Sequence, residues 1–212
     1  MMHRILQPLL VVAAAALSLF AWARVPERAP VHWNLAGAVD RYGARAEVLL
    51  LMPAMMIVIW ALLRFLPRID PRRESYAKME GTYELVITLM LGVLLALHGA
   101  VIAAALGRQV PMGRIAPALL GATFLVLGNV LPRARPNWWF GIRTPWTLSN
   151  DRVWTRTHRV AGYAFIIAGL GLIIAAFSGG VAVKGALLAG GLVAALVPAA
   201  YSYIAWRQET SA

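Results

Sequence analysis

The fold of this chain is decided by YELVITLMLGVLLALHGAVIAAAL, residues 83–106, in which Glu84 and His98 interrupt an otherwise uncharged run. An α-helix needs about 20 predominantly apolar residues to cross the hydrocarbon core of a bilayer. Lipid offers no partner to unpaired backbone groups, and the stretch lacks the alternating polarity of a barrel strand, so a helix is expected. The stretch therefore indicates an integral membrane protein.

Five further stretches have the same character. The chain of 212 residues is 60% hydrophobic, whereas a soluble domain is about 45–50% apolar. The first stretch exceeds the ~7–15 apolar residues of a signal-peptide core, so it is kept as a helix. The predicted fold is an all-α integral membrane protein, a bundle of six transmembrane helices with short loops. The other five helices are expected at Ile5–Ala23, Val48–Phe65, Ile115–Leu131, Val160–Phe177 and Gly185–Trp206.

Basic residues predict the orientation of these spans, because the cytoplasmic loops of membrane proteins carry an excess of lysine and arginine. With the N-terminus inside, seven of the 20 basic residues fall on the outer side, which leaves thirteen inside. Both termini, residues 67–80 and residues 135–158 are therefore expected in the cytoplasm. The outer seven are Arg24, Arg28, Arg41, Arg45, Arg108, Arg114 and Lys184.

This orientation divides the chain into three parts. Residues 1–66 are expected as a two-helix unit with an outer loop, residues 67–82 as a cytoplasmic loop, and residues 83–212 as a four-helix module with a cytoplasmic loop at 132–158. The absence of cysteine excludes disulfides and thiolate chemistry. Basic inner loops explain the net charge of +11 better than nucleic acid does, so the lipid bilayer is the expected partner and no direct nucleic-acid contact is expected.

The inner loop RPNWWFGIRTPWTLSNDRVWTRTH, residues 135–158, is dense in tryptophan and arginine. A membrane-surface anchor would explain the aromatic residues, since tryptophan favours the headgroup level. The ordered run from Gly141 to Thr147 is more specific than an anchor requires. It predicts a turn at Gly141 and a helix start at Thr144-Pro145, with a second start at Ser149. A cytoplasmic docking surface is expected here, formed by Asn137, Gly141, Arg143, Thr144, Pro145, Trp146, Thr147, Trp154 and His158.

The first outer loop contains PVHWNLAGAVD, residues 30–40. Its His32, Asn34 and Asp40 are residue types that bind metals, but a specific site needs more ligands at closer spacing. A structured loop is favoured, in which Asn34 and Asp40 bond nearby backbone groups and Gly37 supplies a turn. These four residues are the expected outer binding residues, and neither a metal nor a cofactor is expected.

Several residues within the spans bear on packing. His98 is expected as a neutral imidazole bonded to a neighbouring helix, since a proton relay would need more ionisable residues than His98 and Glu84. Gly92 and Gly99, each followed four residues on by alanine, permit close helix packing. Pro53 is expected in the first turns of its span, where a missing N–H costs little.

The two polar segments carry a resemblance to a known family. The run Asn129, Pro132-Arg133, Asn137, Gly141 to Leu148, Trp154, Thr157 to Arg159 and Gly162 resembles the signature of the SdpI family of bacterial membrane proteins. The outer motif P-x-H-x-N-x-x-G-x-x-D at Pro30–Asp40 resembles a short domain of unassigned function that often precedes the SdpI module. Together the two resemblances span most of the chain.

The resemblance implies an immunity and signal-transduction protein of the bacterial cytoplasmic (inner) membrane. The protein for which the family is named protects against a secreted peptide toxin and holds a transcriptional repressor at the membrane, so these are the implied partners. A small transporter or flippase is an alternative, for which His98, Glu84 and Asn129 provide a thin polar path. A membrane enzyme is a third hypothesis, and His158 with Asp151 invites it. No serine elbow or HExxH motif occurs, however, so the protein is expected not to be an enzyme.

Overall fold

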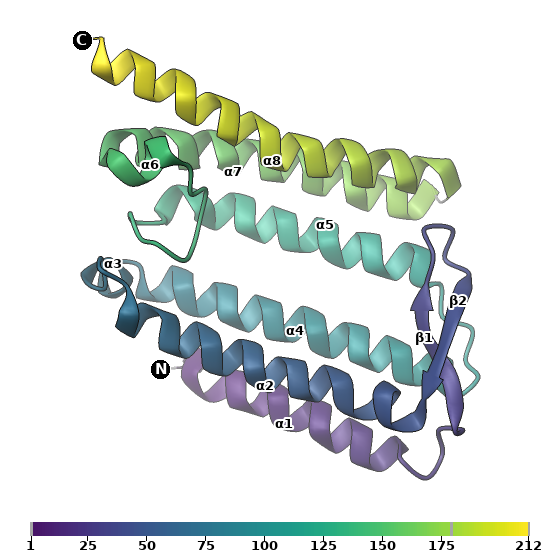
Figure 1. Cartoon of the computed structure of the whole chain (residues 1–212). Coiled ribbons are helices and arrows are strands. Elements are labelled where there is room, and N and C mark those ends of the chain that lie inside the picture. The colour runs from purple at the N-terminus through teal and green to yellow at the C-terminus, as the bar shows by residue number, and fades with distance from the viewer. Residues whose placement is uncertain (1, 179, 212) are drawn as a thin grey trace. The chain divides into compact units, whose positions relative to one another are not determined.

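The computed structural model describes residues 2–178 and 180–211 and is dominated by helices (Figure 1). Within those residues, six helices are long and apolar enough to cross a membrane, which confirms the predicted fold class of an all-α bundle. The six are α1 (Met2–Ala21), α2 (Arg45–Ile69), α4 (Glu80–Ala105), α5 (Met112–Val130), α7 (Asp151–Ser178) and α8 (Gly180–Thr210). Their apolar surfaces imply contact with a lipid bilayer.

The helices extend beyond the apolar stretches that predicted them. α7 begins at Asp151, close to the helix start predicted at Ser149 and ahead of the apolar stretch that starts at Val160, because its polar first turns continue the helical hydrogen bonds. Trp154, His158 and Ala161, which share one face of α7, are fully buried. Short elements fill the connections: α3 (Glu74–Lys78), a 3-10 turn η1 (Leu131–Arg133) and α6 (Pro145–Ser149).

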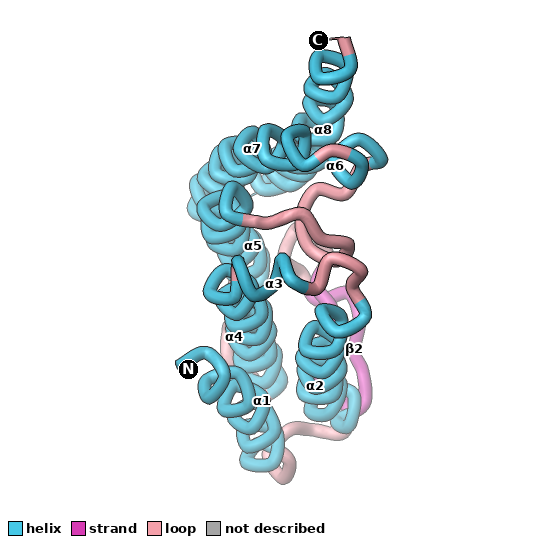
Figure 2. Tube along the Cα trace, turned by 90° about the vertical axis from the view of Figure 1, so that its left-hand side faces the viewer, coloured by secondary structure: helices cyan, strands magenta, loops and turns pink. Residues whose placement is uncertain are grey.

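The loop between α1 and α2 is a β-hairpin, which the sequence patterns did not predict. Strand β1 (Arg28–Trp33) pairs antiparallel with β2 (Val39–Ala44), with register irregularities next to His32. The described part of the chain thus carries one small two-stranded sheet in an otherwise helical protein (Figure 2). The pairing satisfies backbone groups that a loose loop would leave to water.

The chain divides into two compact units. The first combines residues 1–64 with 84–119, and the second combines residues 65–83 with 120–212. These two units are defined by packing. They do not test the predicted domains, residues 1–66, 67–82 and 83–212, which stay a prediction. The hairpin belongs to the first unit, and the loop between α5 and α7 belongs to the second.

The core of the first unit lies where the hairpin meets the helices. Buried apolar side chains come from α1, β1, α2 and α4, so the strands are packed on the helix ends. Gly37, at the hairpin turn with φ +79°, lies against the start of α5: a Cβ there would come 2.9 Å from Gly113 Cα. The cluster comprises Ala21, Val25, Ala29, Val48, Leu49, Ile102 and Ala105.

In the second unit, α5 and α7 cross at glycines. A Cβ on Gly128 would lie 2.7 Å from the carbonyl oxygen of Gly162, and one on Gly121 would lie 2.8 Å from that of Gly169. The backbones therefore approach as closely as small residues allow. The expected close packing at Gly92 and Gly99 is wrong, because an added Cβ meets no described atom within 4 Å at Gly92 and only Leu17 at 3.9 Å at Gly99.

Candidate functional site

Asn137 organises the segment between η1 and α6, residues 134–144, which we call the Asn137 loop (Figure 2). Its side chain is fully buried. The amide nitrogen donates to the carbonyls of Arg135 at 2.8 Å and Phe140 at 2.9 Å. The amide oxygen accepts from the backbone N–H of Trp139 at 2.9 Å and of Phe140 at 2.6 Å. One side chain thus replaces the backbone ladder that a non-helical segment lacks.

A second set of bonds holds the loop from residues 65–83. The Asp70 carboxylate is buried just after α2 and accepts from Tyr76 Oη at 2.7 Å and from the backbone N–H of Trp138 at 2.9 Å. Tyr76 Oη also lies 3.2 Å from the Asn137 amide oxygen. Burial, together with the hydrogen bond to Asp70, raises the pKa of Tyr76 well above its ordinary value. Tyr76 therefore stays protonated and donates.

His158 holds the other side of the loop. Its Nδ1 donates to the Trp154 carbonyl at 2.9 Å, and its Nε2 accepts from the Ile142 N–H at 2.9 Å. This pattern assigns a neutral imidazole with both nitrogens engaged. The ring stacks on Trp154, 4.1 Å between centroids, and Trp154 Nε1 donates to the Ala134 carbonyl at 2.9 Å. A histidine held in this way has no nitrogen free to act as a catalytic base.

The predicted helix start at Thr144-Pro145 is confirmed. Thr144 and Thr147 form a reciprocal capping box at the start of α6. The Thr147 hydroxyl is buried and also donates to the Ile142 carbonyl at 2.8 Å, while Thr144 Oγ1 bonds Ser202 of α8 at 2.9 Å.

The second predicted start, at Ser149, is wrong by one residue. The Asn150 side chain caps α7 by accepting from the N–H groups of Arg152 and Val153. An amide or carboxylate oxygen reaches the first-turn donors as a serine would, so Asn150 serves equally well as the cap. The Asp151 carboxylate in the first turn of α7 pairs with Arg72 at 2.6 Å.

The predicted docking residues separate into a buried frame and an exposed rim. Asn137, Thr147, Trp154 and His158 are buried, and Gly141 and Thr144 are partly buried among them. The exposed side chains are those of Arg143 and Pro145, with Trp146 half-buried on Tyr203 at 5.1 Å between ring centroids. Trp138 and Trp139, not among the predicted residues, are also exposed. We call Trp138, Trp139, Arg143, Pro145 and Trp146 the loop rim.

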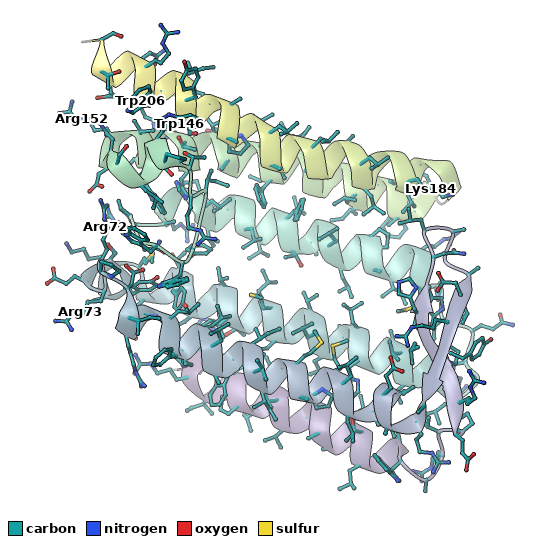
Figure 3. All side chains as sticks on the ribbon, viewed as in Figure 1. Arg72, Arg73, Trp146, Arg152, Lys184 and Trp206 are labelled. Carbon is teal, nitrogen blue, oxygen red and sulfur yellow. The ribbon has the colours of Figure 1, made fainter. Side chains whose placement is uncertain are left out.

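The rim lies at the charged end of the second unit. Figure 3 shows Arg72, Arg73 and Arg152 at the end where Trp146 and Trp206 lie, with Lys184 at the opposite end of α8. Tryptophan beside arginine at one helix end is the arrangement found at a membrane surface.

Sequence reasoning missed Asp70, Tyr76 and Ser202 as parts of this site. The mixed charge of residues 67–80 suggests a solvated loop, which hides the role of Asp70 and Tyr76. A signal was available for Asp70, because a single aspartate directly after a span and before Pro71 favours an Asx turn, which its bond to the Arg72 N–H forms. Nothing local marks Ser202, which lies within a helix.

The hairpin exposes three of the four side chains predicted for binding in this loop. His32, Asn34 and Asp40 are exposed, and Gly37 makes the turn as predicted. Asn34 Oδ1 accepts from the N–H groups of Ala36 and Ala38, as expected. The expectation for Asp40 was wrong, because its carboxylate pairs with His32 Nδ1 across the hairpin at 2.6 Å. His32 and Asp40 therefore form one exposed polar unit.

A polar cluster in the first unit surrounds Glu84. This carboxylate is buried and pairs with Arg64 at 2.5 Å, with Arg4 farther away at 3.6 Å. Gln7 Nε2 donates to it at 2.8 Å, and Gln7 Oε1 accepts from Trp60 at 3.2 Å. The predicted bond of His98 to a neighbouring helix is confirmed, with Ser18 of α1 at 2.8 Å. Thus both ionisable residues of the opening stretch have partners in other helices.

Comparison with known proteins agrees with this division. A family model described as the SdpI/YfhL protein family matches residues 133–202, which begin at the Asn137 loop and end at Ser202. Residues 133–202 are therefore similar to the SdpI/YfhL family. A domain of unknown function, DUF1648, matches residues 9–57, which contain the hairpin and the core beneath it.

One curated relative matches most of the chain. Immunity protein SdpI of Bacillus subtilis (strain 168) is 24% identical over 179 residues, covering 84% of this chain and 83% of that protein. No solved structure matches the chain. The SdpI-family segment thus coincides with the loop and the two helices that hold it.

Proposed function

We propose that this chain is a membrane immunity protein that protects its cell against an extracytoplasmic agent resembling a peptide toxin. The observation that carries the proposal is the similarity to Immunity protein SdpI along 84% of the chain, beside the family matches at residues 9–57 and 133–202. Six helices able to cross a membrane give the chain the multi-pass character that such a role requires.

We further propose that both termini and the Asn137 loop face the cytoplasm of a bacterial inner membrane and that the hairpin faces outward. The thirteen-to-seven distribution of basic residues supports this orientation. The loop rim is then the surface for a cytoplasmic partner, in the proposed case a transcriptional repressor held at the membrane. The buried frame under the rim gives it one shape, which reduces the entropy lost on binding.

On the outer side, we assign recognition to the exposed pair His32–Asp40. Asn34 and Gly37 have a different role in this proposal, since their bonds shape the turn and place it on α5. The role is non-enzymatic: His158, which holds the Asn137 loop, uses both ring nitrogens in structural bonds.

The test is survival of cells that lack their own immunity protein and are challenged with the toxin that the Bacillus protein counters. The parent chain should protect, and His32→Ala or Asp40→Ala should reduce protection at unchanged membrane abundance. Arg28→Gln, an exposed change on the same strand, is the matched control. If the parent chain gives no protection although it is present in the membrane, the immunity proposal fails for this toxin class.

A further inference from the structure

A small pocket in the first unit has His98 among its lining residues. It has a volume of about 60 Å³ and is lined by α2, α4 and both strands of the hairpin. The apolar wall includes Met52 and Val101, and Arg41 and Glu47 lie among its lining residues. We call it the His98 pocket; its residues are Val31, Arg41, Glu47, Val48, Leu51, Met52, His98 and Val101.

The hydrogen bonds around Ser18 determine which nitrogen of His98 carries the proton. Pro53 has no N–H, so the carbonyl of Leu49 lacks its helical donor. Ser18 Oγ supplies one, at 2.6 Å from Leu49 O. The single hydroxyl proton of Ser18 is thereby used, so its contact with His98 Nε2 at 2.8 Å requires Nε2–H to donate. Pro53 is also well inside α2 rather than in its first turns, and the Ser18 bond offsets the cost.

His98 Nδ1 is consequently a bare acceptor. The side chain is fully buried, and Nδ1 has no partner among the described residues. An unsatisfied buried acceptor costs about 1–3 kcal/mol, so a donor that reaches it is favoured. The His98 pocket is large enough to hold water, since a cavity needs only about 10–15 Å³ for one water molecule.

The charges at the pocket favour a neutral occupant. Arg41 and Glu47 pair at 2.7 Å and compensate one another. His98 lies seven positions before the end of α4 at Ala105, about 10 Å along the axis at 1.5 Å per residue, so the pocket is within reach of solution beneath the hairpin.

We propose that the His98 pocket is a hydrated binding site, open on the hairpin side of the membrane, in which a small neutral hydrogen-bond donor donates to His98 Nδ1. Water is the occupant in the resting protein. The site does not depend on the immunity proposal.

The absence of cysteine from the chain permits a direct test. Single variants Met52→Cys and Val101→Cys place a thiol in the pocket wall, and the probe is a charged, membrane-impermeant thiol reagent applied to intact cells. The cysteine thiolate attacks such reagents, and the thiolate forms in water and not in lipid. Leu50→Cys, an exposed position of α2 at the same depth, is the control that should not react. Leu35→Cys, exposed on the hairpin turn, reports the side from which the hairpin is reached.

The expected result is modification of Met52→Cys and Val101→Cys from the side that modifies Leu35→Cys. His98→Leu in the Met52→Cys chain removes the acceptor, and the modification rate should fall on the order of tenfold. Unreactive Met52→Cys and Val101→Cys beside a reactive Leu35→Cys would overturn the proposal, as would equal reaction of Leu50→Cys. Reaction of Leu35→Cys only in inverted vesicles would instead refute the proposed orientation, and the pocket is then tested from that side.

Discussion

Gly141 and His158 are in direct contact, with the glycine Cα placed where any side chain would overlap the imidazole. A Cβ on Gly141 would collide with His158 Nε2 and lie 3.2 Å from Trp154 Cζ2, and the glycine has φ +114°. The N–H that binds Nε2 belongs to the next residue, Ile142. The turn, the histidine and the tryptophan therefore form one interlocked unit at the base of the Asn137 loop.

Gly141→Ala is expected to destabilise the protein by at least about 2 kcal/mol, because both the positive φ and the contact with His158 oppose a side chain. Gly171→Ala is the matched control, since a Cβ there meets no described atom within 4 Å in the interior of α7. Thermal unfolding in detergent should show a lowered midpoint only for Gly141→Ala. Equal midpoints for the two variants would contradict the interlocked unit.

Gly128→Ala is expected to separate α5 from α7, because the new methyl group would lie 2.7 Å from the Gly162 carbonyl oxygen and 2.9 Å from the Ile166 nitrogen. Only the short turn η1 separates α5 from the Asn137 loop, so limited proteolysis should cut the variant faster at residues 134–144. Gly92→Ala, with open space around it, should be cut like the parent. Unchanged cleavage of Gly128→Ala would mean that the helices can move apart without disturbing the loop.

Arg64→Met is expected to lower the free energy of unfolding by about 2 kcal/mol, because the buried Glu84 carboxylate then loses its nearest cationic partner. Fully buried pairs typically cost about 3–5 kcal/mol when broken; Arg64 is partly exposed and Arg4 is near. The double variant Arg64→Met/Glu84→Gln should recover part of the loss, which denaturant titration in micelles would measure. If the double variant loses as much stability as the two single variants added together, the ion pair is excluded as the cause.

The raised pKa of Tyr76 predicts an alkaline loss of stability. Below about pH 10, the ordinary tyrosine pKa, the phenol is protonated in both folded and unfolded chains and its contribution is fully present. Above that value the unfolded phenol ionises while the folded one stays protonated, so the folded state is progressively disfavoured. Tyr76→Phe should be less stable at neutral pH, through loss of the Asp70 bond, but should show a shallower decline above about pH 10. Parallel pH profiles for parent and variant would refute the assignment.

Arg143→Lys tests the loop rim as a docking surface. The guanidinium of Arg143 donates to the Trp138 carbonyl at 2.8 Å and is otherwise exposed. Lysine keeps the charge but cannot present a planar, bidentate donor to a partner. Membrane abundance should therefore be normal while repressor capture or survival is lost, and Arg159→Lys should behave like the parent. Full function of Arg143→Lys would leave the rim as a membrane anchor.

The sequence by itself determined the six helices, the start of α6 and the hairpin turn at Gly37. Each depends on neighbours along the chain: twenty apolar residues, a threonine before a proline, or a glycine where φ is positive. Length and local chemistry suffice for such features, because the bonds that satisfy them lie within a few residues.

Only the tertiary structure decided which polar residues act together. Asp70 reaches Trp138, Ser18 reaches Leu49, and Gly128 meets Gly162 across many intervening residues. Burial of an unbonded polar group is costly, so most such groups take a partner from the segment that packs opposite. That choice depends on the packing of whole helices, which no local pattern in the sequence specifies.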